Sequence, residues 1–339
     1  MRFQAPSSDV MSATLTRARS SEHGRLSDAP RVVTFTPAPA FDRVYSLGEL
    51  SPGAVIRVLN PLVRLAGKGV NVTAALHQGG FTSSRAVVLL DASWPVHDES
   101  WLRIVEQEGA GRWNTVLVEK SGRTTNINET PAPLSTSDWA RACATVLDEV
   151  DRASADWLVI GGTMPLVDGE SPNLAILQQG LATSGTRLCL DTSGATLAEW
   201  LRAGVIPDLV KPNRQELSDA TGTDIQTMGD VLFAAHRLRE MGARAVLSSM
   251  GFDGLLYVGE GEERWCPAPL VEIRNTTGAG DASLAGFLSA TAFGHDRALE
   301  TAASWGALTV TSLSPVAESL RVLDTVRARA LVESHVLIG

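Results

Sequence analysis

The sequence predicts an α/β fold with a mostly parallel central sheet, helices on both faces of that sheet, and a small separate β-sheet. Three observations predict this class. From about residue 136 onward, short apolar runs alternate with helical stretches, which is the pattern of a parallel sheet covered by helices. Two amphipathic, hairpin-like segments come before this region. The composition, with 44% hydrophobic and 20% charged residues in 339 residues, is that of a soluble globular protein with a sizeable core.

The first 30 residues are rich in Ser, Arg and Ala and contain no hydrophobic stretch. They therefore lack the apolar segment of a secretory signal, and Asp9, Glu22 and Asp28 argue against an organellar transit peptide. We expect residues 1–30 to form a disordered tail and residues 31–339 to form one domain. That domain is predicted to begin with "RVVTF" (31–35), a run typical of a buried strand.

The next two segments predict pairs of short strands. In "RVYSLGELSPGAVIRVL" (43–59) two strands are expected around a Gly/Pro turn. In "TVLVEKSGRTTNINE" (115–129) they are expected around a Ser-Gly turn at 121–122. Because both pairs differ from the strand–helix alternation that follows, we expect them to form a small sheet outside the main body.

The remaining strands are predicted at "DWLVIGG" (156–162), "RLCLDTS" (187–193), "DLVKPN" (208–213) and "AVLSSMG" (245–251), with helices between them such as "TMGDVLFAAHRLREMG" (227–242). Each of these runs ends in Gly, Ser, Thr or Asn. In open parallel sheets, ligands bind beyond the carboxyl ends of the strands. The polar residues at these ends are therefore expected to carry the chemistry.

Charge and cysteine content exclude several classes of protein. The net charge of -9 argues against a general binder of nucleic acid or anionic membranes, because phosphate-rich surfaces attract basic patches. No apolar run reaches the roughly 18 residues that a membrane span needs. Cys143, Cys189 and Cys266 show no zinc-type spacing, so we expect reduced thiols in a cytoplasmic protein.

"RLAGKGVNVTAALHQGG" (64–80) contains Gly-Lys-Gly but is not a Walker A loop, because Leu62 and Gly69 stand where that motif needs Gly and Ser/Thr. Lys68 and Asn71 are expected at the amino end of a helix, where free N–H groups also point outward. That combination suits a sugar hydroxyl or a phosphate. Taken alone, a surface lysine in a glycine turn is the simpler interpretation.

"NTTGAGDASLAGFL" (275–288) combines a glycine loop, an aspartate and a small-residue helix. A dinucleotide site is a weak interpretation, because Ser283 replaces the third glycine and Asp281 would face the pyrophosphate. The same geometry suits a phosphoryl group in transfer, which the backbone N–H groups and the helix dipole would stabilise. Asp281 would then accept the proton of an attacking hydroxyl. An N-cap role for Asp281 is equally compatible with the residues.

As a set, "GKGVN", "KPNRQEL" (211–217) and "TTGAGD" resemble the PfkB, or ribokinase-like, family of sugar kinases. The resemblance runs from residue 31 to the C-terminal region. Segments 36–58, 128–133, 160–165, 190–194 and 208–217 are most similar to the branch of 1-phosphofructokinase and tagatose-6-phosphate kinase. The resemblance implies a ribokinase-like three-layer sandwich with a small β-sheet lid, whose strands come from about 43–59 and 112–129.

The resemblance also implies roles for individual residues. Asp281 matches the catalytic base, and the anion hole matches Gly278, Ala279 and Gly280. The sugar or sugar-phosphate side matches Asp42, Gly67, Lys68, Asn71, Arg112 and Asn114. The ATP side matches Asn213, Glu216, Ser249, Gly251 and Gly254, with Asn213 and Glu216 organising Mg²⁺ through water. Glu216 could instead be a capping-box partner, which the preceding Lys-Pro-Asn makes less favoured.

The implied activity is ATP-dependent phosphorylation, with fructose 1-phosphate as acceptor and fructose 1,6-bisphosphate as product. The alternatives are a tagatose-6-phosphate kinase, a kinase for an unphosphorylated sugar or nucleoside, a sugar-phosphate sensor, and an NAD-dependent dehydrogenase. Three departures from the family pattern fall on the sugar side, at Ala38, Ala66 and "ASWPV" (92–96). The family further suggests a homodimer formed through the lid sheet.

Overall fold

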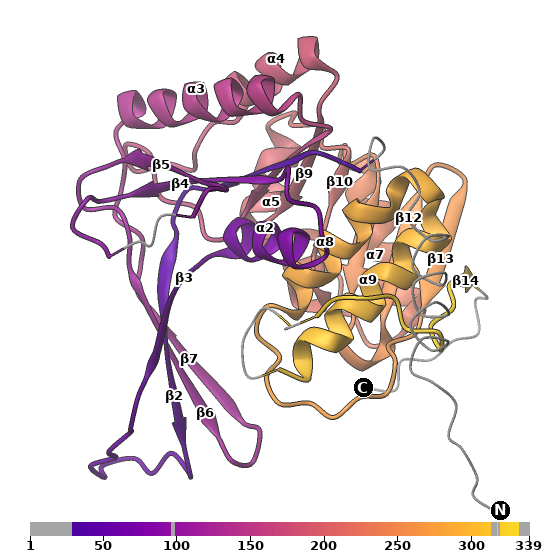
Figure 1. Ribbon diagram of the computed structural model, residues 1–339. Coiled ribbons are helices and arrows are strands. Elements are labelled where there is room, and N and C mark those ends of the chain that lie inside the picture. The colour runs from indigo at the N-terminus through magenta and orange to yellow at the C-terminus, as the bar shows by residue number, and fades with distance from the viewer. Residues whose placement is uncertain (1–28, 96–98, 313–316, 318, 332–339) are drawn as a thin grey trace, which may run out of the picture.

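The computed structural model describes residues 29–95, 99–312, 317 and 319–331 (Figure 1). In this part of the chain the main sheet has the strand order β14-β13-β12-β11-β10-β9-β8-β1-β4-β5. Its strands are β1 (Val32–Thr36), β4 (Arg85–Leu90), β5 (Leu102–Glu106), β8 (Trp157–Gly161), β9 (Arg187–Asp191), β10 (Leu209–Val210), β11 (Val246–Ser249), β12 (Leu255–Gly259), β13 (Glu262–Cys266) and β14 (Arg329–Ala330). Strands β5 to β11 pair in parallel, whereas β11 to β14 pair antiparallel.

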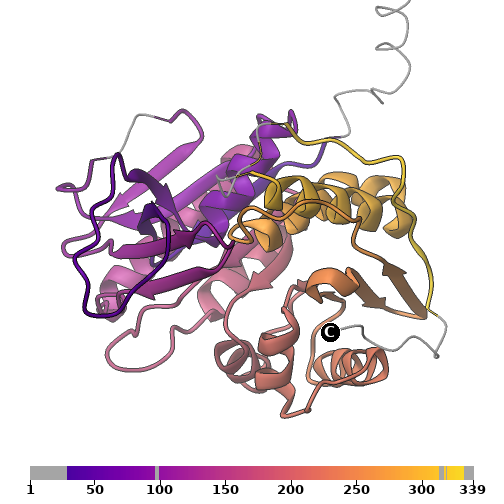
Figure 2. The ribbon, with the colours of Figure 1, turned by 90° about the horizontal axis from the view of Figure 1, so that it is seen from below.

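Helices cover both faces of this sheet. One face carries α3 (Thr136–Ala153), α4 (Ala175–Ser184), α5 (Gly194–Arg202), α6 (Arg214–Thr221) and α7 (Met228–Glu240). The other carries α2 (Lys68–Gln78), α8 (Ala279–Ala290) and α9 (His295–Val310). In Figure 2 the gold helices and the salmon helices lie on opposite sides of the strands.

Side-chain alternation along the strands divides the core in two. Val33 and Phe35 of β1 belong to the cluster under α3 to α7, whereas Val32 belongs to the cluster under α2, α8 and α9. Successive strand residues point to opposite faces, so a strand that is buried on both faces becomes a continuous apolar run. The predicted α/β class, with a mostly parallel sheet, is confirmed.

The small sheet projects from the main body in Figure 1 and has the strand order β3-β2-β6-β7. Its strands are β2 (Ala40–Leu47), β3 (Leu62–Ala66), β6 (Trp113–Glu119) and β7 (Thr124–Asn128). The predicted pair at 115–129 is present as β6 and β7. The predicted second strand of 43–59 is wrong, because residues 48–61, all of them described, form no strand.

The partner of β2 is instead the segment directly before α2. Val55 and Leu59 are 80% and 88% exposed, so their segment finds no apolar surface to pack on. In β3, by contrast, Leu65 packs against an apolar cluster at the base of the small sheet, and Ala66 is buried. Packing of Leu65 and Ala66 at the base of the small sheet therefore favours the segment that ends at residue 66 as the strand.

The expected N-terminal tail lies outside the described residues, except for positions 29 and 30. Among the described residues, no helix has the length and apolar character that crossing a membrane requires. The three cysteines are buried and free of disulfides.

Helices α8 and α9 pack closely because glycine leaves room between them. A Cβ added to Gly286 in α8 would lie 2.9 Å from the carbonyl oxygen of Thr301 in α9. This contact matters for the site, because α8 begins at the carboxyl edge of the sheet, where the candidate residues gather.

Gly286→Ala is expected to lower the free energy of unfolding by about 1–3 kcal/mol, because the methyl group would force the two helices apart. Chemical denaturation measures this change. Gly229→Ala in α7 is the matched control, because its Cβ would make only an ordinary contact, 3.6 Å from Thr227 Oγ1. The control should be neutral or stabilising by up to about 1 kcal/mol. Equal losses in the two variants would contradict the close-packing argument.

Candidate active site

The candidate residues meet at the carboxyl edge of the main sheet. Asp191 ends β9, Lys211 follows β10, and Ser249 ends β11. The amino ends of α2 and α8 reach the same edge, and these two helices lie side by side (Figure 1). This is the edge at which open parallel sheets bind ligands.

Gly67 alone joins strand β3 of the small sheet to helix α2. Its φ of 137° lies in the region that favours glycine, and an added Cβ would approach Thr36 Cγ2 to 2.7 Å. The departure at Ala66 causes no backbone strain, because Ala66 is a strand residue and is not among the described non-glycine residues with positive φ. The strained conformation falls on Gly67, which tolerates it.

Three polar side chains form one row across the small sheet. Asp42 is directly paired with Arg64 of β3 and with Asn114 of β6. Arg64 Nη2 lies 3.3 Å from Asp42 Oδ2, and Asn114 Nδ2 donates to Asp42 Oδ1 at 3.2 Å. Directly paired residues share a face, so the row presents two donors to one buried carboxylate.

Hydrogen bonds extend this row in both directions. Arg112 donates to Asn114 Oδ1 at 2.8 Å, to the carbonyl of Glu129 at 2.9 Å, and to Thr163 Oγ1 at 3.3 Å. At the other end, Arg64 Nη2 donates to Asn71 Oδ1 at 2.8 Å.

Asn71 completes the connection by donating through Nδ2 to Asp281 Oδ2 at 2.7 Å. The structure thus brings the expected sugar-side residues Asp42, Asn71, Arg112 and Asn114 together with Asp281. Arg64 belongs to the same chain of contacts, although sequence reasoning assigned it no role.

Asp281 is the third residue of α8, and the helix is capped by Gly278 at φ 81° without a side-chain cap. The N-cap interpretation of Asp281 is therefore wrong. Its carboxyl group is buried, and burial together with the nearby carboxylate of Asp191 raises the pKa of Asp281 to about 6. Lys68, the hydrogen bond from Asn71, and Lys211 act in the opposite direction.

Lys68 points away from the row of the small sheet. Its Nζ donates to Asp191 Oδ1 at 2.6 Å and to Glu216 Oε1 at 2.9 Å. Burial by itself would lower the pKa of Lys68, but the two carboxylates outweigh it and hold the pKa above its ordinary value. Two carboxylates thus neutralise the ammonium of Lys68 in this structure, and its expected place on the sugar side stays a prediction.

Sequence reasoning assigned no role to two further buried residues, Asp191 and Lys211. Lys211 Nζ lies 3.3 Å from Asp191 Oδ2, and a Cβ on Gly280 would lie 3.3 Å from the same nitrogen. The ammonium of Lys211 therefore lies against the amino end of α8, where anions are favoured. The signal was present: both residues are polar and lie in the second halves of predicted strands, at 187–193 and 208–213.

Asn213 and Glu216 form a complete capping box at the start of α6. Asn213 Oδ1 accepts from the Glu216 N–H, and Glu216 Oε2 accepts from the Asn213 N–H, both at 2.9 Å. The disfavoured capping interpretation is therefore correct for the local structure. The reason is that the side chain of a residue three positions after the N-cap points back toward the N-cap backbone.

The carboxylates near Lys68 fit a role in organising magnesium–ATP. Asp191 and Glu216 converge on one ammonium, and the buried Asp191 Oδ2 has no hydrogen bond among the described residues beyond its ion pair with Lys211. In the same part of the chain, no group of three or more His, Cys, Asp or Glu residues is arranged as a metal site. Magnesium usually keeps several of its waters, so these few carboxylate oxygens are enough for an ion that is also bound to phosphates.

Three of the five expected ATP-side residues line one cavity of about 310 Å³, whereas Asn213 and Glu216 lie outside its lining. Ser249, Gly251 and Gly254 form one side of it, and Ala279 and Gly280 of α8 form another. The walls are otherwise mainly apolar, as suits a flat ring system. The cavity therefore leads from an apolar chamber to the amino end of α8.

An aromatic cluster at the base of the small sheet explains the departure at 92–96. Trp94 stacks on Phe41 with centroids 4.6 Å apart, and it lies 5.0 Å from the ring of Trp113. Gly111 leaves room for Trp94, because a Cβ there would lie 2.4 Å from Trp94 Nε1. The tryptophan thus anchors the small sheet to the loop that follows β4.

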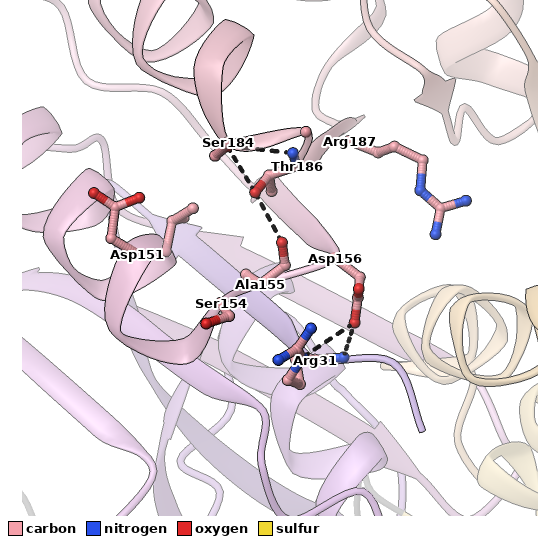
Figure 3. Close-up of a pocket in the computed structure, with 10 residues that line it drawn as sticks. Arg31, Asp151, Ser154, Ala155, Asp156, Ser184, Thr186 and Arg187 are labelled. Atoms are coloured by element: carbon pink, nitrogen blue, oxygen red, sulfur yellow. Dashed lines mark hydrogen bonds and ion pairs between the residues drawn. The ribbon is translucent and has the colours of Figure 1, made fainter. Parts of the chain in front are cut away.

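A larger cavity of about 550 Å³ lies at the opposite, amino-terminal edge of the sheet (Figure 3). It is lined by residues just before or at the starts of β1, β8 and β9, among them Arg31, Asp156 and Arg187. Arg31 donates to Asp156, and the guanidinium of Arg187 stacks on Trp157 at 4.0 Å. Because the strands separate this cavity from Asp281, it takes no part in the candidate site.

Comparisons with known proteins identify the family of this chain. Residues 99–320 match the family described as pfkB family carbohydrate kinase. The 1-phosphofructokinase of Escherichia coli (strain K12) is 32% identical over 265 residues, covering 76% of this chain and 83% of the relative.

Two solved structures show the same fold. Escherichia coli phosphofructokinase-2 in complex with fructose-6-phosphate has a TM-score of 0.72 at 24% identity, covering 85% of this chain and 96% of that one. Arabidopsis thaliana ribokinase complexed with ribose and ATP has a TM-score of 0.63 at 19% identity, covering 86% and 96%. The expected ribokinase-like sandwich with a small separate sheet is confirmed.

The buried charge of Asp281 makes a pH-dependent prediction for stability. A carboxyl group whose pKa is higher in the folded chain than in the unfolded chain destabilises the fold when it is ionised. The full loss of stability is present above the folded pKa, and none of it remains below the unfolded pKa. Asp281→Asn should therefore raise the free energy of unfolding by up to about 3 kcal/mol near pH 8, and the gain should vanish as the pH falls through 6 toward 4. Denaturant titrations across this range measure it. A gain that does not change with pH would contradict the buried-charge argument.

Proposed function

The chain belongs to the pfkB family of carbohydrate kinases, and on that premise we propose that it phosphorylates fructose 1-phosphate to fructose 1,6-bisphosphate. As a member of this family it is an ATP-dependent sugar kinase, which sets the dehydrogenase interpretation aside. The identity of the acceptor and the roles of individual residues are part of the proposal. The name of the 32% identical relative, 1-phosphofructokinase, supports this acceptor.

One observation carries the choice of a phosphorylated acceptor. Arg112 is only 8% exposed, and its described partners are all neutral: the amide oxygen of Asn114, the carbonyl of Glu129 and the hydroxyl of Thr163. Its Nε is buried without a hydrogen-bond partner among the described residues. The carboxylates of Asp42 and Glu129 act on Arg112 electrostatically, but neither forms an ion pair with it in the described part of the chain. A buried cation without a directly paired counter-ion is costly, and a phosphate matches the planar fork of a guanidinium. We infer that Arg112 binds the phosphate group of the acceptor.

In the proposed mechanism, Asp281 accepts the proton of the acceptor's primary hydroxyl while that oxygen attacks the γ-phosphorus of ATP. The bond between the γ-phosphorus and the β–γ bridging oxygen breaks as the new one forms, and ADP leaves. The first N–H groups of α8, at Gly278 to Gly280, and the ammonium of Lys211 stabilise the charge on the transferring group. Arg112 and Asn114 hold the acceptor, and Asp42 binds its hydroxyls.

On the nucleotide side, the apolar cavity at Ser249, Gly251 and Gly254 is proposed to hold the adenine and ribose. Lys68, Asp191 and Glu216 lie where the phosphates would meet this edge, and Asn213 holds Glu216 in position. Magnesium bound there, partly through water, would screen the charges of the phosphates. A buried site also excludes water, which would otherwise compete as the phosphoryl acceptor.

We also propose that two chains pair through their small sheets. Val63 and Ile127 are 44% and 59% exposed, and they lie on the face turned away from Asp42. Exposed apolar side chains on such a sheet are typical of an interface. The buried free thiols agree with a cytoplasmic location, which we likewise propose.

The base role of Asp281 is tested by Asp281→Asn. The variant should fold, bind ATP and lose turnover by about 10²–10⁴-fold, which is the usual contribution of a general base. Release of ADP in the presence of Mg-ATP and acceptor measures turnover. Asp151→Asn, an exposed aspartate at the end of α3, is the control and should retain wild-type turnover. An Asp281→Asn enzyme with near wild-type turnover would end the proposed role.

The acceptor is tested with a panel of fructose 1-phosphate, fructose 6-phosphate, tagatose 6-phosphate, free fructose, ribose and adenosine. Arg112→Gln should raise KM for the phosphorylated acceptor by about 10–100-fold, because it removes a charged hydrogen bond to the phosphate. KM for Mg-ATP should not change. Arg103→Gln, an exposed arginine on β5, is the control.

Turnover of tagatose 6-phosphate alone would replace the proposed acceptor but keep the role of Arg112. Turnover of a free sugar or nucleoside alone, unaffected by Arg112→Gln, would discard the phosphate clamp while leaving the kinase activity. Binding of sugar phosphates without any turnover would favour a sensor.

A further inference from the structure

Arg64 is half-buried between the small sheet and the main body and has two partners of different kinds. Its Nη2 lies 3.3 Å from a carboxylate oxygen of Asp42 and 2.8 Å from the amide oxygen of Asn71. The side chain is 19% exposed, and its Nε is buried without a hydrogen-bond partner in the described part of the chain. A guanidinium placed in this way costs stability unless a counter-ion or strong hydrogen bonds compensate for its burial.

The contact with Asn71 has a directional consequence. A guanidinium can only donate, whereas an amide has an oxygen that accepts and a nitrogen that donates. Arg64 therefore selects the orientation in which Asn71 Oδ1 faces it. In that orientation Asn71 Nδ2 faces Asp281, to which it donates at 2.7 Å. The reverse orientation would set two acceptor oxygens against each other.

We propose that Arg64 is a positioning residue, which fixes the orientation of the Asn71 amide and so keeps its N–H group directed at the Asp281 carboxylate. The inference rests on the proposed role of Asp281 as base. A hydrogen bond donated to a carboxylate favours its ionised form, which is the form that can accept a proton.

The relay crosses the joint between the small sheet and the body. Arg64 lies on β3, before Gly67, and Asn71 lies in α2, after it. Asp42, the other partner of Arg64, belongs to the neighbouring strand of the small sheet. The ionisation of Asp281 therefore depends on the position of the small sheet, because Arg64 lies on that sheet.

Other charges also face Asp281. They are Lys68 on α2, Asp191 at the end of β9, Lys211 after β10, and Arg64 itself on β3. Loss of the Arg64 charge could therefore act on Asp281 directly, without Asn71. A test must separate this direct electrostatic effect from the orientation of the amide.

The test is a carbon-13 NMR titration of the Asp281 carboxyl group in the full chain without substrate, assigned as the signal that is lost in Asp281→Asn. Arg64→Met should raise the pKa of Asp281 by about one unit, because the donated hydrogen bond to the carboxylate is lost. Arg64→Lys, which keeps a donor, should restore at least half of this shift. Arg43→Met, on the other face of the same sheet over Trp113, should cause no shift.

A double-mutant cycle separates the two mechanisms. Asn71→Leu should raise the pKa of Asp281 by a similar amount, and adding Arg64→Met to it should cause no further rise. An equal shift from Arg64→Met in both backgrounds would mean that Arg64 acts by charge alone and would overturn the proposal. The absence of any shift in Arg64→Met would also overturn it.

If Asn71→Leu fails to fold, Arg64→Gln provides the decision. The Gln side chain is neutral but keeps an N–H donor. A wild-type pKa of Asp281 in Arg64→Gln supports the orienting role, and a pKa as high as in Arg64→Met overturns it. Turnover separates this inference from the proposed function. Full activity of Asp281→Asn would refute Asp281 as base, whereas an unshifted titration in Arg64→Met refutes only the relay.

Discussion

The carboxylate of Asp281 is the constraint on which the rest of the site depends. It is buried at the first turn of α8, and burial disfavours its charge. Several elements compensate: the hydrogen bond from Asn71, the ammonium groups of Lys68 and Lys211, and the dipole of the helix. These groups come from α2, α8 and the loop after β10. The sheet must bring all of them to one edge for the charge to be tolerated.

Asp281 also marks the boundary between two polar networks. On one side a chain of hydrogen bonds runs from Arg112 through Asn114, Asp42 and Arg64 to Asn71. The other network joins Lys68 to Asp191 and Glu216, with Lys211 beside Asp191. The first contains two arginines and one aspartate, whereas the second balances two ammonium groups against two carboxylates. In the proposed function this difference has a purpose, because the first network accepts a phosphorylated sugar and the second binds a nucleotide whose phosphates arrive with magnesium.

The small sheet, which carries part of the first network, is attached to the main body at two places. Gly67 is a single-residue joint at a φ that other residues rarely adopt, and the stack of Trp94 on Phe41 anchors the sheet to the main body. The departure from the family pattern at 92–96 thus belongs to one packed cluster with Phe41 and Trp113. Side chains on the opposite face of the same strands form the polar row at Asp42. One small sheet therefore carries both an apolar attachment and the acceptor-side polar groups.

The sequence by itself determined the α/β class, five strands of the main sheet, the hairpin at 115–129 and the carboxyl edge as the place for the polar residues. These follow from local periodicity and from turn residues, which act over a few positions. The tertiary structure alone decided which segment pairs with β2, because β3 is selected by burial at the base of the small sheet rather than by its own pattern. It also decided that Lys68 turns toward Asp191 and Glu216, and that Arg64 contacts Asn71. Those pairings join residues on separate elements, and the direction of a long, flexible charged side chain depends on partners that only the folded chain brings near.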